Sequence, residues 1–561
     1  MDRIKPRQSY SRTGFVLVFL LMLLLAFSRG VTTTRDLHWA ADADFDRDIS
    51  YVQGTLDGHF GDDPSYAGEY LWYNPLLFSV ETLLVKATGL PINDVVTRAG
   101  AYLNLLGPAA FFTMAALLLG FEIALASTLA FLFLSSGNIP GWGAATYSPW
   151  LYPVCFAQWM FYIGILLCYK AFSTGKLSWF AALGAITGTL FLGHAAPTVI
   201  LVLLIAILQA GNILDALRKK EGRLATRHIT HSLITAATFL ITSLPLTWYV
   251  VGKYHLHSIN RETFEYTEGI FIPKNLPAMI RANLSVALLI SIIGFAWFWK
   301  NTVDTLLRKI LLGWIGLALF LYCYSTLVAQ LDWKYHIHLP GTVPSFHYFF
   351  YLKAAQSVFF GFGFIYLFRL AMRRLAPSAS PATSAITLGS IVIACCIAYY
   401  PFYRDRDDFT ALRKAALYKE QQKDKVDAYN YIVSHVPAEG VILCPADSSS
   451  LFPVMATGRK MVSTAFTFSN PYVDFIRRES DRLNMVHYLC TGEPASARAT
   501  FQQYKVHYAL VPNNLTGDAP LRVPARKLHS NDTYTLYSLN IDTTYSADRI
   551  APPRSKDKTK L

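Results

Sequence analysis

The apolar run TGFVLVFLLMLLLAFS at residues 13–28 is followed, after a short connecting stretch, by the acidic sequence DADFDRD at residues 42–48. The apolar run together with Arg29 predicts a membrane-spanning helix, because roughly 17 to 25 helical residues cross the hydrocarbon core of a bilayer. The acidic sequence puts four carboxylates beside that membrane, and like charges so close raise one another's pKa unless a cation or several hydrogen-bond donors lie nearby. It therefore indicates a site for a metal ion, a proton or a polar substrate. The alternative is a solvated loop in which Asp44 or Asp46 caps a helix.

The composition identifies the class of protein. Hydrophobic residues make up 53% of the 561 residues and charged residues only 16%, and apolar runs long enough to span a bilayer recur along the chain. We therefore predict an α-helical polytopic membrane protein. The sequence has neither a glycine-rich phosphate loop with a lysine nor a Gly-x-Ser-x-Gly motif, which argues against an ATP-driven pump and a serine hydrolase. The predicted spans are 13–29, 97–119, 121–136, 150–170, 177–193, 195–212, 231–251, 284–299, 310–329, 351–370 and 385–402.

The distribution of basic residues predicts the orientation of these spans, because cytoplasmic loops carry an excess of Lys and Arg. The basic residues precede the first span and then occupy every second loop: Arg3, Lys5, Arg7 and Arg12; Lys170 and Lys176; Arg218, Lys219, Lys220, Arg223 and Arg227; Lys300, Arg308 and Lys309; and Arg369, Arg373 and Arg374. The N-terminus is therefore expected in the cytoplasm. With eleven spans, the C-terminus lies outside, as do the loops 30–96, 252–283 and 330–350. The net charge of +13 is then mainly a signal of topology and does not indicate nucleic-acid binding.

Two polar regions are expected outside the membrane. The loop 30–96 belongs to a transmembrane domain that covers residues 1–402, and it contains two amphipathic pieces, 49–56 and 76–87. Residues 403–550 predict an α/β domain, because a charged helical stretch at 407–436 is followed by β-branched runs at 440–444, 506–511 and 533–538 and by a helical run at 471–489. The tail 551–561, rich in Pro, Lys and Arg, is predicted to be disordered. Cys444 and Cys490 lie in the outer domain, where they either form a disulfide or stay apart.

Two short motifs carry a resemblance to a known family. Residues 42–45, Asp-Ala-Asp-Phe, resemble the Asp-x-Asp-aromatic motif in the first luminal loop of the GPI mannosyltransferases. Residues 70–77, YLWYNPLL, resemble the aromatic-x-Pro-Leu-Leu segment of those enzymes and of the lipid A aminoarabinose transferases, although Tyr73 and Asn74 stand where those transferases carry Glu-Lys. Together with the order of spans, acidic outer loop and C-terminal outer domain, these motifs make the chain similar to the GT-C superfamily of polyprenyl-phosphate-dependent glycosyltransferases.

The resemblance implies a reaction on the outer face of the membrane, which for this chain we expect to be a bacterial inner (cell) membrane. A hexosyl or pentosyl group would move from a polyprenyl-phosphate donor to a lipid, glycan or protein acceptor of the cell envelope, and membrane lipids would be the other partners. One carboxylate would accept the proton of the acceptor hydroxyl, and the lipid phosphate would leave without ATP. The catalytic candidates are Asp44, Asp42 and Asp48, and a divalent cation (Mg or Mn) is a further option at Asp42 and Asp44. If the segment from Asp46 is helical, Asp44 and Asp48 lie about one turn apart on a common face.

The donor phosphate needs cations or hydrogen-bond donors at the outer ends of the spans. Lys353 enters the tenth span shortly after His347, and an ionisable residue in a span is a functional candidate. His194 lies at the outer turn between the fifth and sixth spans, as a histidine does in several bacterial GT-C proteins. The alternatives are a Lys353 that extends to the interface and a His194 that only stabilises the turn.

Further candidates for acceptor binding or for a lid lie in the outer segments. They are Tyr73, Asn74, His255, Arg261 and Arg459. A second class of function is a transporter or flippase for lipid-linked saccharides, or a membrane protein that binds them. A transporter is expected to place charged residues near the middle of the bilayer, whereas here the spans are almost free of charge and the acids gather in an outer loop. The pattern therefore favours glycosyl transfer at the outer face.

Overall fold

The computed structural model describes residues 9–41, 43–134, 146–260, 284–341, 343–444, 452–493, 497–516 and 521–540. Asp42, Arg261 and the tail 551–561 lie outside these described residues. The contacts within the chain divide it into two units. The helical unit comprises Met1–Asp63, Glu69–Gln422 and Phe466–Val473, and the sheet unit comprises Pro64–Gly68, Lys423–Ala465 and Asp474–Leu561.

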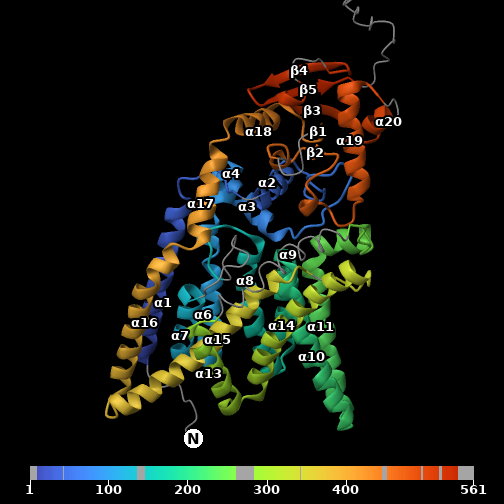
Figure 1. Cartoon of the computed structure of the whole chain (residues 1–561). Coiled ribbons are helices and arrows are strands. Elements are labelled where there is room, and N and C mark those ends of the chain that lie inside the picture. The colour runs from blue at the N-terminus through green and yellow to red at the C-terminus, as the bar shows by residue number, and fades with distance from the viewer. Residues whose placement is uncertain are drawn as a thin grey trace, which may run out of the picture. The chain divides into compact units, whose positions relative to one another are not determined.

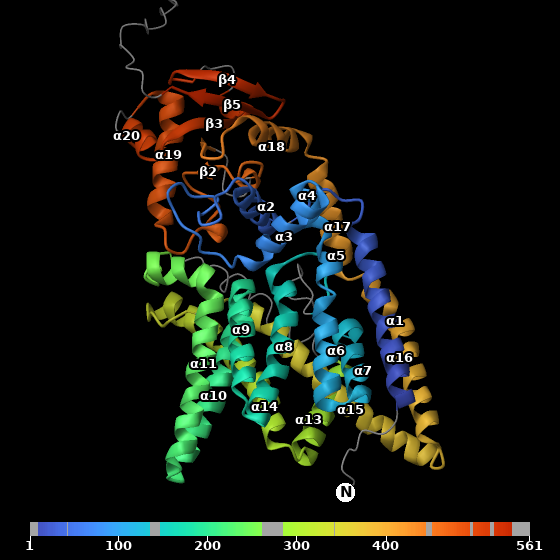
Figure 2. The same ribbon diagram turned by 180° about the vertical axis from the view of Figure 1, so that it is seen from behind.

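The helical unit contains the apolar helices (Figures 1 and 2). In the part of the chain that the structure describes, eight helices are long and apolar enough to cross a membrane, and three shorter apolar helices accompany them. Each predicted span falls on one of these helices, so the predicted polytopic α-helical class is confirmed. The helices are α1 (Ser9–Thr34), α6 (Leu106–Leu119), α7 (Phe121–Leu129) continued by η1 (Ala130–Leu134), α8 (Pro153–Thr174), α9 (Leu177–Gly193), α10 (Ala195–Arg218), α11 (Gly222–Thr247) continued by η2 (Trp248–Lys253), α13 (Val286–Asn301), α14 (Thr305–Tyr335), α15 (Phe346–Leu375) and α16 (Pro381–Arg404).

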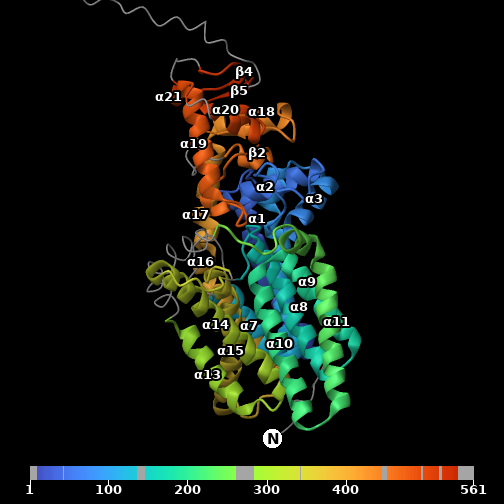
Figure 3. The same cartoon turned by 90° about the vertical axis from the view of Figure 1, so that its right-hand side faces the viewer.

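Glycines bring some of these helices into backbone contact. A Cβ atom on Gly294 of α13 would collide with the carbonyl of Phe359, and one on Gly363 of α15 would collide with the carbonyl of Ile290. Small residues at such positions let membrane helices approach closely. The same holds for Gly184 of α9, which faces α11, and these two helices lie side by side (Figures 2 and 3). The close contact between α13 and α15 holds α15 in place, and α15 carries His347 and Lys353.

The first outer loop forms short helices. They are α2 (Ala43–Leu56) and α3 (Leu76–Thr88); α4 (Ile92–Arg98) and α5 (Gly100–Leu103) follow and, with α6, make up the apolar run Ile92–Leu119. The two amphipathic pieces predicted there are confirmed, but α2 begins six residues earlier than expected, at Ala43. Asp44 and Asp46 occupy its first turn, where negative charge stabilises the helix N-terminus. Helix α3 ends at Gly89, whose φ of 68° is the left-handed conformation that glycine adopts readily.

The charged stretch expected as one helix at 407–436 forms two helices in different units. Helix α17 (Asp407–Glu420) belongs to the helical unit, and α18 (Lys423–His435) belongs to the sheet unit. Two contacts tie α17 to the first outer loop: Lys419 binds Asp46 at 2.6 Å, and Glu420 accepts a hydrogen bond from the backbone of Trp39 at 3.1 Å. These long-range contacts explain why a stretch that the sequence groups with the outer domain packs with the membrane helices.

The sheet unit is a mixed α/β structure, as predicted. Its five strands lie in the order β2-β1-β3-β5-β4; β2, β1 and β3 are parallel, whereas β5 is antiparallel to β3 and to β4. The strands are β1 (Val441–Leu443), β2 (Lys460–Met461), β3 (Val506–Pro512), β4 (Ala525–Ser530) and β5 (Tyr534–Leu539). The helices are α18, α19 (Phe475–Thr491), α20 (Ala497–Gln503), α21 (Asn513–Thr516) and η3 (Met455–Thr457), and η4 (Phe466–Phe468) lies in the helical unit.

The core of the sheet unit forms between the sheet and α19, which lies alongside the strands (Figure 3). Met485 and Leu489 of α19 pack with Leu443, Val506 and Ala509 of the strands. The predicted strands at 440–444, 506–511 and 533–538 are confirmed, whereas β2 and β4 were not expected. Cys444 is buried and Cys490 is exposed, and no disulfide joins them.

Candidate functional site

Helix α2 gathers two acids around one arginine. Asp44 and Asp48 are four residues apart, so they lie on the same side of the helix with Arg47 beside them. Arg47 donates from Nη1 to Asp44 Oδ1 at 2.7 Å, and from Nε and Nη2 to Asp48 Oδ1 at 3.0 and 2.9 Å. The Asp48 side chain is 3% exposed and that of Asp44 is 30% exposed. Asp44 is therefore the carboxylate of this cluster that solvent or a substrate can reach.

Aromatic rings hold the guanidinium of Arg47. It lies 4.0 Å from the centre of the Tyr73 ring and 5.8 Å from that of Phe468, which the segment Phe466–Val473 contributes to the helical unit. Burial by itself lowers the pKa of Arg47, but Asp48, Tyr73 and Asp44 outweigh it and raise this pKa well above its ordinary value. Arg47 is therefore a permanent positive charge between two carboxylates.

The third acid of the motif that the structure describes, Asp46, has a different environment. It lies on another side of α2 and accepts a hydrogen bond from Lys419 Nζ at 2.6 Å. Asp46 is 3% exposed and Lys419 is 7% exposed, so the pair is dry. Asp46 thus joins α2 to α17 and does not face the same site as Asp44.

The sequence-predicted histidines meet at the ends of α9 and α15. The ring centres of His194 and His347 are 4.8 Å apart. His194 caps α10, because its Nδ1 accepts a hydrogen bond from the backbone of Ala196 at 3.1 Å. Burial lowers the pKa of His194 well below its ordinary value, and His347 and then Arg47 lower it further.

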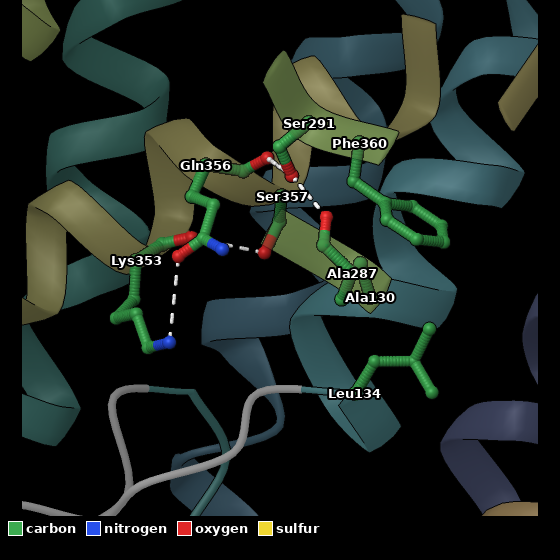
Figure 4. A pocket seen from close by; sticks show the side chains of 8 residues that line it. All are labelled: Ala130, Leu134, Ala287, Ser291, Lys353, Gln356, Ser357 and Phe360. Carbon is green, nitrogen blue, oxygen red and sulfur yellow. Dashed lines mark hydrogen bonds between the residues drawn. The ribbon is translucent and has the colours of Figure 1, made fainter. Parts of the chain in front are cut away.

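Lys353 lies in a separate pocket (Figure 4). The pocket is lined by residues of η1, α13 and α15: Ala130, Leu134, Ala287, Ser291, Lys353, Gln356, Ser357 and Phe360. Lys353 is 5% exposed, and its Nζ donates to Oε1 of Gln356 at 3.4 Å. Six residues separate it from His347, a rotation of about 240° around the helix, so the two side chains leave α15 on different sides.

The residues predicted to bind the acceptor or to form a lid lie in different surroundings. Tyr73 stacks on Arg47, and the Asn74 amide donates to the carbonyl of Phe191 at the end of α9. His255 is exposed on the segment after η2, and its φ is 52°. Arg459, in the sheet unit, is buried and donates to the carbonyls of Val436 and Val433 at 2.9 and 3.0 Å, the arrangement of a structural residue. Asp42 and Arg261 lie outside the described residues.

The segment after η2 also holds part of the C-terminal region in the helical unit. Tyr254 accepts a hydrogen bond from the backbone of Tyr70 at 2.7 Å and one from Asn470 at 3.1 Å, and its ring stacks on that of Tyr472. The backbone amides of residues 259 and 260 donate to the carbonyl of Pro471 at 2.9 Å. These contacts anchor the segment Phe466–Val473, whose Phe468 lies against Arg47.

Three residues of this region were not singled out from the sequence: Arg47, Phe468 and Glu81. Arg47 could have been found from its helical spacing, because Asp44 precedes it by three residues. Glu81 is a single acid in the apolar helix α3, and it is completely buried. Burial raises its pKa well above the ordinary value, the charge of Asp48 raises it further, and Arg47 opposes the shift. Phe468 offers no local signal, because only the fold brings it to α2.

A divalent cation would need several ligating side chains close together among the described residues. Among them, no group of three His, Cys, Asp or Glu side chains is arranged to hold one. Arg47 already binds the carboxylates of Asp44 and Asp48, so its positive charge lies where a cation bridging them would have to bind. The described side chains of the cluster do not fit the expected cation.

Comparison with known proteins supports the fold assignment. No protein-family model and no curated protein sequence matches the chain. Several solved structures match the chain in fold. ArnT from Cupriavidus metallidurans in the apo state matches with a TM-score of 0.54 at 13% identity, over 94% of this chain and 98% of that one. The same protein bound to undecaprenyl phosphate gives 0.53 at 12% identity, over 94% and 98% of the two chains.

An archaeal enzyme gives a similar result. The oligosaccharyltransferase AglB from Archaeoglobus fulgidus, in complex with an inhibitory peptide and a dolichol-phosphate, matches with a TM-score of 0.52 at 12% identity, over 89% of this chain and 69% of that one. These matches confirm the predicted GT-C-like fold: many membrane-spanning helices followed by a C-terminal α/β unit. The protein is thus an integral multi-pass membrane protein whose fold is similar to those of ArnT and AglB.

Proposed function

We propose that the protein is a glycosyltransferase that moves a sugar from a polyprenyl-phosphate donor to a lipid, glycan or protein acceptor of the cell envelope. The observation that carries the proposal is the cluster of Asp44, Arg47 and Asp48, which combines two carboxylates with one guanidinium and leaves the Asp44 side chain 30% exposed. The likeness to ArnT bound to undecaprenyl phosphate and to AglB with a dolichol-phosphate supports a polyprenyl phosphate as the donor's carrier.

Asp44 is proposed as the base, because its side chain is the more exposed of the two that bind Arg47. It takes the proton from the acceptor hydroxyl as the oxygen of that hydroxyl forms a bond to the anomeric carbon. The bond from this carbon to the phosphate oxygen breaks, and its electron pair leaves with the lipid phosphate. Asp48 holds Arg47 in place, so that the guanidinium orients Asp44.

His194 and Lys353 are proposed as alternative contacts for the donor, because Lys353 lies in a pocket of its own. Nδ1 of His194 accepts a hydrogen bond from Ala196, so its single proton is on Nε2, which can donate to a phosphate oxygen. Lys353 offers a positive charge, and charge-assisted hydrogen bonds to phosphate are stronger than neutral ones. Tyr73 and the segment that contains His255 would border the acceptor, next to Arg47 and Tyr70. A structure of the Archaeoglobus fulgidus oligosaccharyltransferase contains Zn and sulfate, but because Arg47 binds both carboxylates here, no step is derived through a metal ion.

Transfer of labelled sugar by the purified protein tests this function. A panel of polyprenyl-phosphate sugars is supplied together with an extract of envelope lipids and glycans. We expect labelled product with the wild-type protein and about a hundredfold to ten-thousandfold slower transfer with Asp44→Asn. Absence of transfer from every donor, together with movement of lipid-linked saccharide across proteoliposome membranes, would instead establish the transporter alternative.

The proposed orientation places the sheet unit outside a bacterial inner membrane. Cys490 is a native probe, because it is exposed and free in that unit. A membrane-impermeant maleimide should label intact cells, and Cys490→Ser should remove that label. Labelling of Cys490 only after permeabilisation would reverse the orientation and put the acidic cluster on the cytoplasmic side.

A further inference from the structure

Glu81 is a buried acid beside the acidic cluster, and nothing in the reaction proposed above uses it. Its exposed fraction is 0%. Neither side-chain oxygen has a hydrogen-bond partner within the described parts of the chain. A carboxylate that is buried without a partner is strongly unfavourable, and a carboxyl group in such a place binds a proton instead.

Helix α3, which carries Glu81, packs against α2, which carries Asp48. The ring of Phe78 in α3 stacks on Tyr51 of α2 at 4.6 Å and lies 6.0 Å from Phe60, which follows the end of α2. The start of α3 therefore lies beside the C-terminal half of α2. Residues three apart are neighbours on one helix face. Glu81 is three residues after Phe78 on α3, and Asp48 is three residues before Tyr51 on α2.

The charged groups around Glu81 come from α2. Asp48 disfavours a negative charge on Glu81, and Arg47 favours one. Helix α4 also packs against α3, but its Asp94 and Arg98 bind each other at 3.3 Å. Helix α9, which contacts α3 as well, has no titratable side chain between Leu177 and Gly193.

We propose that Glu81 carries a proton at neutral pH and therefore adds no charge to the acidic cluster. With Glu81 neutral, the two carboxylates of Asp44 and Asp48 face the single positive charge of Arg47, and the cluster keeps one uncompensated negative charge. An ionised Glu81 would add a second uncompensated charge in a buried place. The role in turnover rests on the proposed function, whereas the proton on Glu81 does not.

The proton can be detected directly in the variant Glu81→Gln, in which a neutral amide of the same shape replaces the acid. Infrared spectra of the purified protein near neutral pH in heavy water should show a protonated carboxyl band that Glu81→Gln removes. Glu493→Gln, the same exchange at an exposed residue of the sheet unit, is the matched control and should leave that band unchanged. If Glu81→Gln does not fold, Glu81→Leu removes the same group.

Thermal unfolding gives a second test that does not depend on activity. A carboxyl whose pKa is raised by folding keeps its proton in the folded state and loses it in the unfolded state, so its contribution to stability falls as pH rises above about 4.5. The difference in unfolding temperature between Glu81→Gln and the wild-type protein should therefore grow by several degrees from about pH 5 to about pH 8.

Turnover of Glu81→Gln at neutral pH should stay within a few-fold of wild type, because the amide keeps the neutral charge of the acid. An unchanged infrared band, together with parallel stability profiles, would overturn the proposal and show that Glu81 is ionised. The proposed function could fail while the proton on Glu81 is confirmed. In that case the wild-type protein would transfer no sugar, but Glu81→Gln would still remove the infrared band and its unfolding temperature would still diverge from that of the wild type with pH.

Discussion

Helix α2 carries two ionic clusters that differ in composition and exposure. On one side, Asp46 and Lys419 form a dry pair with one acid and one base at 2.6 Å. On the other side, Asp44 and Asp48 share the single guanidinium of Arg47, and the Asp44 side chain is 30% exposed. The balanced, closed pair has no charge left with which to act on a substrate. The partly exposed cluster of Asp44, Arg47 and Asp48 has one uncompensated negative charge. We therefore assign a structural role to the Asp46–Lys419 pair and a catalytic role to this cluster.

The largest effect is expected from Asp44→Asn. Asparagine keeps the shape and an acceptor oxygen but does not accept a proton near neutral pH, so turnover should fall about a hundredfold to ten-thousandfold while the protein stays folded. Initial rates of sugar transfer measure this loss. Asp48→Asn and Asp42→Asn, tested in parallel, rank the acids. Near-normal turnover of Asp44→Asn together with an inactive Asp48→Asn would move the base to Asp48, and three active variants would refute the mechanism.

Lys419→Met should act in the opposite way and lower stability rather than turnover. It leaves Asp46 buried without its cation, and breaking one partner of a buried ion pair typically lowers the free energy of unfolding by about 3 to 5 kcal/mol. Thermal unfolding in detergent measures the change, and the double variant Asp46→Asn with Lys419→Met should recover part of it. A stable Lys419→Met protein that has lost turnover would erase the distinction between the two clusters.

Lys353 and Lys419 are both buried, but they contact different groups. Lys353 donates to the neutral side chain of Gln356, whereas Lys419 binds the carboxylate of Asp46. If Lys353 binds the donor phosphate, Lys353→Met should weaken donor binding about tenfold, a loss of about 1.5 kcal/mol, because charge-assisted contacts exceed neutral ones. The apparent affinity for the donor is the quantity to measure. Unchanged affinity would return Lys353 to the alternative of a lysine that extends to the interface.

The smallest effect concerns the pKa of His194, which burial, His347 and then Arg47 lower. Because folding lowers the pKa of His194 below its ordinary 6.5, the unfolded chain binds a proton there that the folded protein does not, and stability falls as pH drops below about 6.5. His194→Gln should reduce this loss, which unfolding temperatures between about pH 5 and pH 7 would reveal. Identical pH profiles for both proteins would mean that His194 is protonated in the folded state.

The sequence predicted most of the elements because their signals are local. A span needs a minimum length of apolar residues to cross the hydrocarbon core, so each of the predicted spans corresponds to an apolar helix. Strands β1, β3 and β5 are rich in apolar and β-branched residues, and they were found. Strand β4, with the sequence ARKLHS, lies at the edge of the sheet and is largely exposed, so nothing in its composition distinguishes it from a loop.

The sequence by itself determined the GT-C-like architecture and the position of the acidic motif, since both depend on hydrophobic length and on residues within a few turns of each other. The tertiary structure alone identified the partner of Asp46, because Lys419 is 373 residues away in the chain. It also brought His194 to His347 and buried Glu81 beside α2. Partners so distant leave no periodic pattern in the sequence. The charge that each acid carries therefore becomes visible only once the helices are packed together.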